Sequence, residues 1–270
     1  MAVKKETEEI AVVEDATLAF SLDDFADLKS SAGLGMEIVD TSDIVMPKIK
    51  MCQSNSREVM DGLAKPGQFY NSMTKEAKDT LDDVVIMCFG KSRIRFKQPF
   101  NRNDAPLCRS LDGILSTEGE VCENCQYCQW QDKDGNQADP ECRMSYTLLG
   151  FEYKEDGDFG TPFRMLVTGS SIPEFKRTCL TPLKVAGYPP FIFRCQVTSK
   201  KTEKDGNIFF VEEIVLKKTE DGKFITINPK YKDMLKDLTE RWNSMMNKVN
   251  DFETTHAAEE VAENPEGAIF

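Results

Sequence analysis

Five of the nine cysteines in this chain fall within a stretch of 35 residues, from Cys108 to Cys142. The stretch is rich in Gly, Asp, Asn, Glu and Gln, which cannot build a hydrophobic core by themselves. Within it, Cys122 and Cys125 have the Cys-x-x-Cys spacing that lets two thiolates face one metal ion. A bound metal would supply the folding energy that such a segment lacks, so the sequence predicts a metal-binding subdomain at residues 106–143.

Zinc is the metal that this pattern favours, because Zn²⁺ in structural sites takes four thiolate ligands in a tetrahedron. A set that uses one Cys-x-x-Cys pair and closes both flanking loops consists of Cys108, Cys122, Cys125 and Cys142. Cys128 forms a second, overlapping pair with Cys125 and is the reserve ligand. An iron–sulfur cluster is the less favoured alternative, and a segment without metal stays open. Four thiolates leave no open coordination position, so we expect a structural zinc and no catalytic one.

The rest of the composition argues against an enzyme and against a disulfide-bonded secreted protein. The single histidine, His256, lies in a polar segment, which disfavours histidine-based catalysis. The N-terminus has no apolar signal region, so we expect a reducing cytoplasm, that of the host if the protein is phage-encoded. No apolar run is long enough to span a membrane. The other four cysteines have apolar neighbours and are predicted to be buried thiols: Cys52, Cys88, Cys179 and Cys195.

The net charge of −12 is concentrated at the two ends of the chain. Residues 1–45 contribute −8 and residues 251–270 contribute −6, so residues 46–250 sum to +2. We therefore expect a slightly basic body between two acidic arms, the second of them disordered. That arm ends on Ile269 and Phe270, which predicts a hook for a pocket on a partner protein, although a chance apolar terminus is the alternative.

Runs of β-branched and aromatic residues bounded by turn residues predict a mainly β (α+β) chain. The predicted strands are 44–51, 84–89, 93–97, 145–153, 163–168, 191–199, 208–217 and 224–227. Shorter helices are predicted over 56–64 and 172–185, and a longer amphipathic helix over 230–249. Many short strands with small helices favour a compact β-barrel, closed or partly open, and no phosphate-binding glycine motif points to an α/β fold.

Two stretches combine cations with aromatic rings, as a surface for phosphates and stacked bases requires. The first carries Arg93, Arg95, Phe96, Lys97, Phe100, Arg102 and Arg109. The second carries Tyr188, Phe191, Arg194 and Lys200. On a strand, Arg93 and Arg95 share one face, where they repel each other unless an anion lies opposite. A solvated strand face with its rings in the core is the alternative interpretation.

With these features together, the chain resembles phage-encoded single-stranded-DNA-binding proteins that carry a zinc site inserted in an OB-type barrel. The resemblance rests on the segment Pro106–Gly113, the Cys122–Cys125 pair with Cys142, the flanking strands and the acidic end closing on Phe270. The implied organisation is an acidic arm at 1–43, an OB-like domain at 44–229, a helix at 230–250 and a disordered acidic tail at 251–270.

The function that this resemblance implies is sequence-independent binding of single-stranded DNA in replication, recombination or repair. The tail would recruit replication or recombination proteins through its last two residues. The competing hypothesis is a zinc-containing interaction or regulatory protein that docks on a polymerase, such as that of a host. A metal-dependent nuclease is disfavoured, because Glu174 and Lys176 have no acidic partner on a preceding strand.

Overall fold

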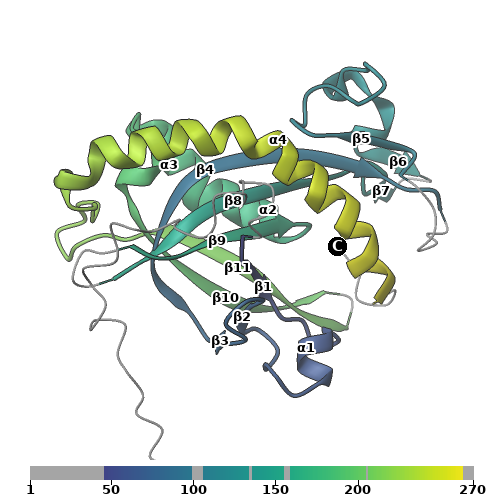
Figure 1. Cartoon of the computed structure of the whole chain (residues 1–270). Coiled ribbons are helices and arrows are strands. Elements are labelled where there is room, and N and C mark those ends of the chain that lie inside the picture. The colour runs from purple at the N-terminus through teal and green to yellow at the C-terminus, as the bar shows by residue number, and fades with distance from the viewer. Residues whose placement is uncertain (1–45, 99–105, 134–135, 155–158, 205, 264–270) are drawn as a thin grey trace, which may run out of the picture. The chain divides into compact units, whose positions relative to one another are not determined.

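A computed structural model describes residues 46–98, 106–133, 136–154, 159–204 and 206–263 (Figure 1). These residues belong to one compact unit. The predicted N-terminal arm and the C-terminal Ile269 and Phe270 lie outside the described residues, as do Phe100 and Arg102. No helix in the described ranges is long and apolar enough to cross a membrane.

A curled half-barrel sheet forms the centre of this unit (Figure 1). In spatial order its strands are β11 (Asn207–Leu216), β10 (Arg194–Lys204), β4 (Leu81–Arg95), β8 (Arg143–Tyr153), β9 (Phe159–Thr168), β1 (Lys48–Met51), β2 (Phe69–Asn71) and β3 (Ala77–Lys78). The short β5 (Cys108–Ser110) pairs with the end of β4 on the edge opposite β8. Neighbouring strands are antiparallel except β1 and β9, which are parallel.

The helices and the remaining strands lie around this sheet. They are α1 (Arg57–Met60), α2 (Ser171–Phe175), α3 (Thr181–Ala186), α4 (Lys232–Glu263) and a separate hairpin of β6 (Gln131–Lys133) and β7 (Asn136–Ala138). A π-helical turn at 176–180 joins α2 to α3, so the helix predicted over 172–185 is present in three segments.

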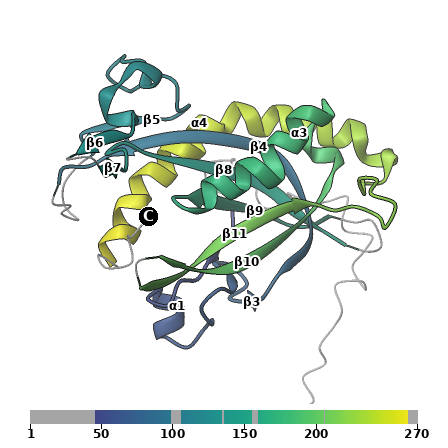
Figure 2. The same ribbon diagram turned by 180° about the vertical axis from the view of Figure 1, so that it is seen from behind.

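Both faces of β4 are buried between Val84 and Cys88, which explains why this part of the strand is apolar on both sides. Val84 and Ile86 point into the curl, where α2 and α3 fill the interior (Figure 2). Val85 and Met87 point outward against α4, which lies along the other face of β4. A register shift between Ile86 and Cys88 interrupts the strict alternation at this point.

Strand β4 combines two strands that the sequence predicts separately. Gly90 and Ser92 continue the strand, because β8 pairs with it without a break from Cys88 to Ile94. Gly90 leaves room for α4, since a Cβ at that position would lie too close to the sulfur of Met246, which would have to move. By contrast, the strand predicted over 224–227 is reduced to isolated bridges.

The outer edge of β11 is covered by side chains and not by another strand. The bonded pairs are Gln53 with Phe210, Ser171 with Glu212, and Thr178 with Ile214. Gln53 acts as a surrogate strand residue, because its amide both donates to the Phe210 carbonyl (2.8 Å) and accepts from the Phe210 amide (2.9 Å). Covering an edge in this way prevents it from pairing with another chain.

The predicted mixture of strands and helices with a C-terminal helix is therefore confirmed, and the sheet that forms is a curled half-barrel in place of the predicted OB-like barrel. β4 pairs with β10, β8 and β5, and no pairing joins β11 to β3 among the described residues. The tail prediction also needs a correction, since α4 continues through Glu263. Ala and Glu are strong helix formers, and the helix ends just before the residue that precedes Pro265.

Candidate metal centre and nucleic-acid surface

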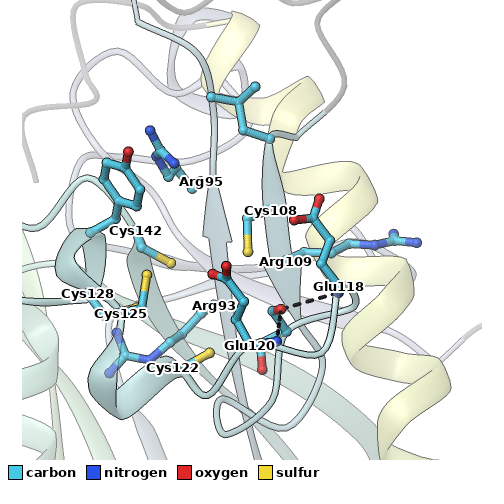
Figure 3. Close-up of a pocket in the computed structure, with 14 residues that line it drawn as sticks. Arg93, Arg95, Cys108, Arg109, Glu118, Glu120, Cys122, Cys125, Cys128 and Cys142 are labelled. Carbon is cyan, nitrogen blue, oxygen red and sulfur yellow. Dashed lines mark hydrogen bonds between the residues drawn. The ribbon is translucent and has the colours of Figure 1, made fainter.

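All five clustered cysteines line one cavity of about 170 Å³ at the end of β4 (Figure 3). We call residues 106–133 and 136–142 the cysteine lobe. The cavity lies between this lobe and β4, which contributes Arg93 and Arg95 to its lining. The lining therefore includes the four cysteines predicted as zinc ligands and Cys128, the reserve ligand.

Short backbone hydrogen bonds place the cysteines around the cavity. Cys108 lies on β5 opposite Arg95, and the Cys122 amide donates to the Ile114 carbonyl at 2.8 Å. Two successive 3₁₀ turns then carry residues 122–124 and 126–128. The lobe closes where the Cys142 amide donates to the Tyr127 carbonyl, also at 2.8 Å.

The thiols lie close enough to affect one another. The side chains of Cys128 and Cys142 are hydrogen-bonded to each other. Burial raises the pKa of both thiols, and it also raises the pKa of Cys108, which Glu118 raises further. The described residues contain no group of three or more His, Cys, Asp or Glu side chains already spaced to hold a metal ion.

Two observations nevertheless fit a thiolate-bound cation. The donor set is rich in soft sulfur, which Zn²⁺ accepts. Arg93 lies near Cys128 and Cys142, and its buried Nε has no hydrogen-bond partner. Four thiolates around a divalent ion carry a net charge of about −2, so the guanidinium would find its counter-charge there. Cys128 is hydrogen-bonded to Cys142 and lines the same cavity as the four ligands predicted from the sequence.

Arg95, predicted to bind phosphate, packs against the lobe instead of projecting into solvent. Its guanidinium carbon lies 3.2 Å from the centre of the Tyr127 ring. Its Nε donates to a carboxylate oxygen of Glu141 at 3.2 Å. Through these contacts, Arg95 of β4 holds the lobe against the strand.

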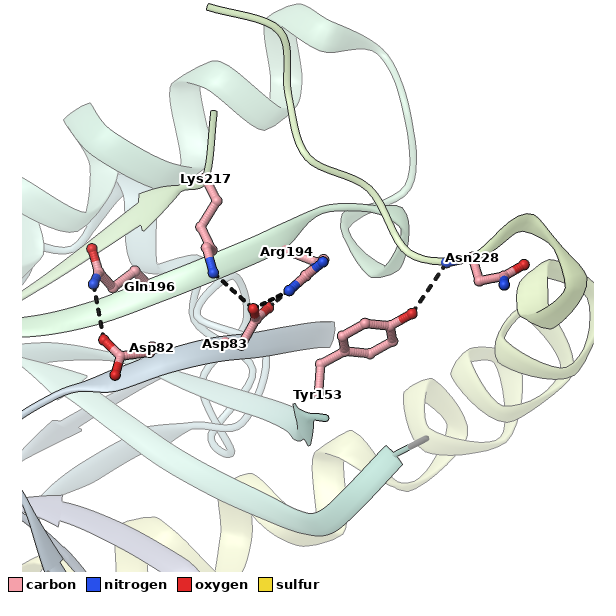
Figure 4. Close-up of polar contacts among 7 residues, drawn as sticks. All are labelled: Asp82, Asp83, Tyr153, Arg194, Gln196, Lys217 and Asn228. Carbon is pink, nitrogen blue, oxygen red and sulfur yellow. Dashed lines mark hydrogen bonds and ion pairs between the residues drawn. The ribbon is translucent and has the colours of Figure 1, made fainter. Parts of the chain in front are cut away.

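Arg194, a second predicted phosphate ligand, lies in a cluster of charges at the opposite end of β4 (Figure 4). Its Nε donates to Asp83 at 2.7 Å, and Lys217 bonds the same carboxylate at 2.7 Å. Burial alone would raise the pKa of Asp83, but the hydrogen bonds from Arg194 and Lys217 outweigh it and lower this pKa. The Tyr153 ring lies 4.9 Å from the Arg194 guanidinium, and its hydroxyl accepts from the Asn228 amide at 3.3 Å.

The other predicted residues divide between the two ends of β4. Phe191 is buried in the outer core, and Tyr188 beside it is exposed. Lys97 and Lys200 are exposed. The remaining two, Phe96 and Arg109, make contacts within the protein.

The predicted residues near Arg93 and those near Arg194 lie far apart along β4. Arg194 pairs with Val85, and Arg93 lies eight residues further along the strand, roughly 26 Å away at 3.3 Å per residue. The two predicted stretches therefore do not form one continuous groove.

The structure brings together a set of residues that the sequence prediction passed over. Lys91 shares the inner face of β4 with Arg93, and Lys176 approaches it from the turn after α2. Burial lowers the pKa of Lys91, and the charges of Arg93 and Lys176 lower it further, whereas Cys122 and Asp112 oppose this shift. Tyr146 on β8 lies beside Arg93 and packs edge-on against Phe175, with ring centres 5.4 Å apart. The alternation of Lys91 with Arg93 was visible in the sequence, but Lys176 was not.

Charge separates the lobe from the rest of the body. Residues 106–142 contain two Lys or Arg and eight Asp or Glu, a net charge of −6. Because residues 46–250 sum to +2, the remainder of that body carries +8. A polyanion is therefore attracted to the sheet body and repelled by the lobe.

In a comparison with protein families, residues 13–251 match the Pam3 phage gp34-like proteins. Searches of the curated proteins and of the solved structures give no match. The matched range includes the whole half-barrel, the cysteine lobe and most of α4. The chain belongs to the Pam3 phage gp34-like protein family.

Proposed function

We propose that this protein binds single-stranded DNA without sequence preference, on the inner face of the sheet near the lobe. The observation that carries the proposal is the convergence of Lys91, Arg93 and Lys176 from two elements that are distant in sequence. We call these three residues the cation cluster. Replication, recombination and repair are the processes that expose such strands, and a phage protein would meet them in the host.

Electrostatic repulsion within the cation cluster is the first argument. Three like charges held near one another repel; Asp112 opposes this repulsion at Lys91, and a bound phosphate would oppose it further. Lys176 is exposed and Lys91 is half-buried, so both can reach a phosphate from solvent. A backbone with a phosphate at every nucleotide matches several cations along a surface.

Tyr146 supplies the second argument. Its ring is half-buried and lies at the border between the cation cluster and the core of the curl. Unpaired bases offer their π-faces to such a ring, whereas bases in a duplex are already stacked. Stacking and phosphate contacts do not distinguish one base from another, which favours binding without sequence readout.

Zinc has a structural role in this proposal. Four of the five lobe cysteines would hold the ion, with Arg93 beside the thiolates as counter-charge. The ion would fix the lobe against the end of β4 and thereby fix Arg93. The set Cys108, Cys122, Cys125 and Cys142 remains our assignment, with Cys128 as the alternative ligand.

The test is a fluorescence titration of labelled oligo-dT with the full chain. We expect Lys91→Ala with Lys176→Ala to weaken binding about tenfold or more, since each lost phosphate contact costs affinity. The matched control is Lys223→Ala with Lys236→Ala, two exposed lysines on the connector before α4 and on α4 itself. Equal affinities of the two double variants would refute the cation cluster, and tighter binding to duplex of the same length would refute the preference for single strands.

A further inference from the structure

We propose that the hairpin from Ile114 to Cys122 docks a basic, apolar segment of a partner protein. Its apolar side chains face solvent: Ile114 is 64% exposed, Leu115 48% and Val121 45%. Leu115 and Val121 form a cross-strand bridge, so their side chains lie next to each other on one face. Lys91 packs against Gly113 at the base of this hairpin, but none of the three apolar residues belongs to the cation cluster, and the proposal does not depend on DNA binding.

Exposed apolar side chains are concentrated in this lobe. Among the large hydrophobic residues that are exposed in the described ranges, five of thirteen fall between Leu107 and Trp130. Single exposed apolar residues are ordinary on protein surfaces, but a concentration of them on one small subdomain is typical of interaction sites. Trp130, at 61% exposed, also belongs to the residue type most enriched in binding hot spots.

The hairpin is held rigidly before any partner arrives. One carboxylate oxygen of Asp112 accepts from the amides of Ile114 (2.8 Å) and Leu115 (2.9 Å). The Ser116 hydroxyl accepts from two further amides in the turn, and Gly119 takes the positive φ of 88° that this turn requires. A surface that is already ordered loses little conformational entropy on binding, which favours recognition.

The charge of the lobe selects the chemistry of the occupant. With a net charge of −6 over residues 106–142, the lobe repels nucleic acid and anionic membrane surfaces. It equally repels a second copy of itself and the two acidic arms of its own chain. The occupant that satisfies both the apolar face and the negative field is an amphipathic segment with Lys or Arg beside an apolar stripe.

The probe is a labelled amphipathic helical peptide of Leu and Lys, about 18 residues long, titrated by fluorescence anisotropy with the full chain. The variant replaces Ile114, Leu115 and Val121 with Thr, which keeps strand propensity and net charge but removes the apolar surface. We expect this variant to bind the peptide about tenfold more weakly or worse. The control Val185→Thr, at a more exposed apolar position of α3, should bind as the unmodified chain does.

Other outcomes of the same experiment would overturn the proposal. A peptide of Leu and Glu that binds as tightly would show that charge does not select the partner. Unchanged affinity of the triple variant would show that the basic peptide binds elsewhere, for instance on the acidic arms. A dimer in sedimentation that the triple variant abolishes would make a second copy the occupant. If the triple variant does not fold, Leu115→Thr alone should weaken binding about threefold, and no change would count against the proposal.

Discussion

The side-chain amide of Asn250 donates to the carbonyl oxygen of Leu111 at 2.6 Å, which ties helix α4 to the base of the cysteine lobe. The same amide reaches the Lys91 carbonyl at 3.4 Å, so one residue links α4, the lobe and β4. Asn250 is 1% exposed, and it lies beside Lys91, the cation-cluster residue on β4 that comes first in the sequence. The position of the lobe therefore depends on α4 as well as on any metal.

Asn250→Asp should destabilise the protein, because the carboxylate cannot donate to Leu111 and would be buried among carbonyl oxygens. We expect a loss of about 2–3 kcal/mol in the free energy of unfolding, measured by urea titration. Asn250→Ala is the matched control, which removes the bond without adding a charge and should cost less. If the Asp variant is as stable as the unmodified chain, this link does not hold the lobe.

Gln53→Glu should weaken the closure of the β11 edge. The carboxylate can still accept from the Phe210 amide but cannot donate to its carbonyl. We expect a loss of about 1–2 kcal/mol by urea titration, together with a greater tendency to aggregate, because the strand edge becomes available. An unchanged unfolding midpoint and unchanged light scattering would contradict this function of Gln53.

Glu212 should make stability fall as the pH rises from about 4.5 to 7. Burial raises the pKa of this carboxyl to about 7, against the opposing hydrogen bond from Ser171. The folded state then keeps a proton that the unfolded state releases, so folding is favoured at the acidic end of this window and loses that advantage as the pH approaches 7. Above pH 7 the loss is complete, and it amounts to about 3 kcal/mol.

The variant that isolates this effect is Glu212→Gln, whose amide oxygen can still accept from Ser171. Urea unfolding of both proteins at pH 5 and pH 8 gives the comparison. We expect the Gln variant to gain stability relative to the unmodified chain at pH 8 and little at pH 5. Parallel pH dependences would mean that Glu212 is not held neutral.

The metal assignment predicts about one zinc per chain by elemental analysis. In a scan of single Cys→Ser variants across the five lobe cysteines, four should lose zinc and one should retain it. Our assignment predicts that Cys128→Ser is the variant that retains zinc. If Cys108→Ser retains it instead, Cys128 is a ligand and Cys108 is not. Full zinc content in all five variants, or iron in place of zinc, would contradict the proposed site.

The sequence predicted those elements whose pattern is local. The strand expected at 208–217 matches β11, and the helix expected from residue 230 forms because Leu235, Trp242 and Met246 recur on its buried face. Local patterns failed where the reason lies elsewhere in the chain. In the sequence, Gly90 is typical of a strand end. Only the structure shows that Met246 packs against it within a continuous strand.

The candidate site shows the same division between local and distant information. The cysteines converge as their spacing predicts, since they are neighbours in sequence. The hydrogen bond from Arg194 to Asp83 joins residues that are 111 positions apart, and no sequence pattern in either segment predicts it. The charge of Lys176 acts on Lys91 because the turn after α2 packs inside the curl.

The slope of log affinity against log salt concentration for oligo-dT tests the central claim most directly. Each phosphate contact on a single strand contributes about −0.7 to this slope. We predict that Lys91→Ala with Lys176→Ala flattens the slope by about 1.4, while the Lys223→Ala with Lys236→Ala control leaves it unchanged. An unmodified protein whose affinity does not depend on salt, or a slope that the first double variant does not change, would contradict the proposal that these lysines hold the DNA backbone.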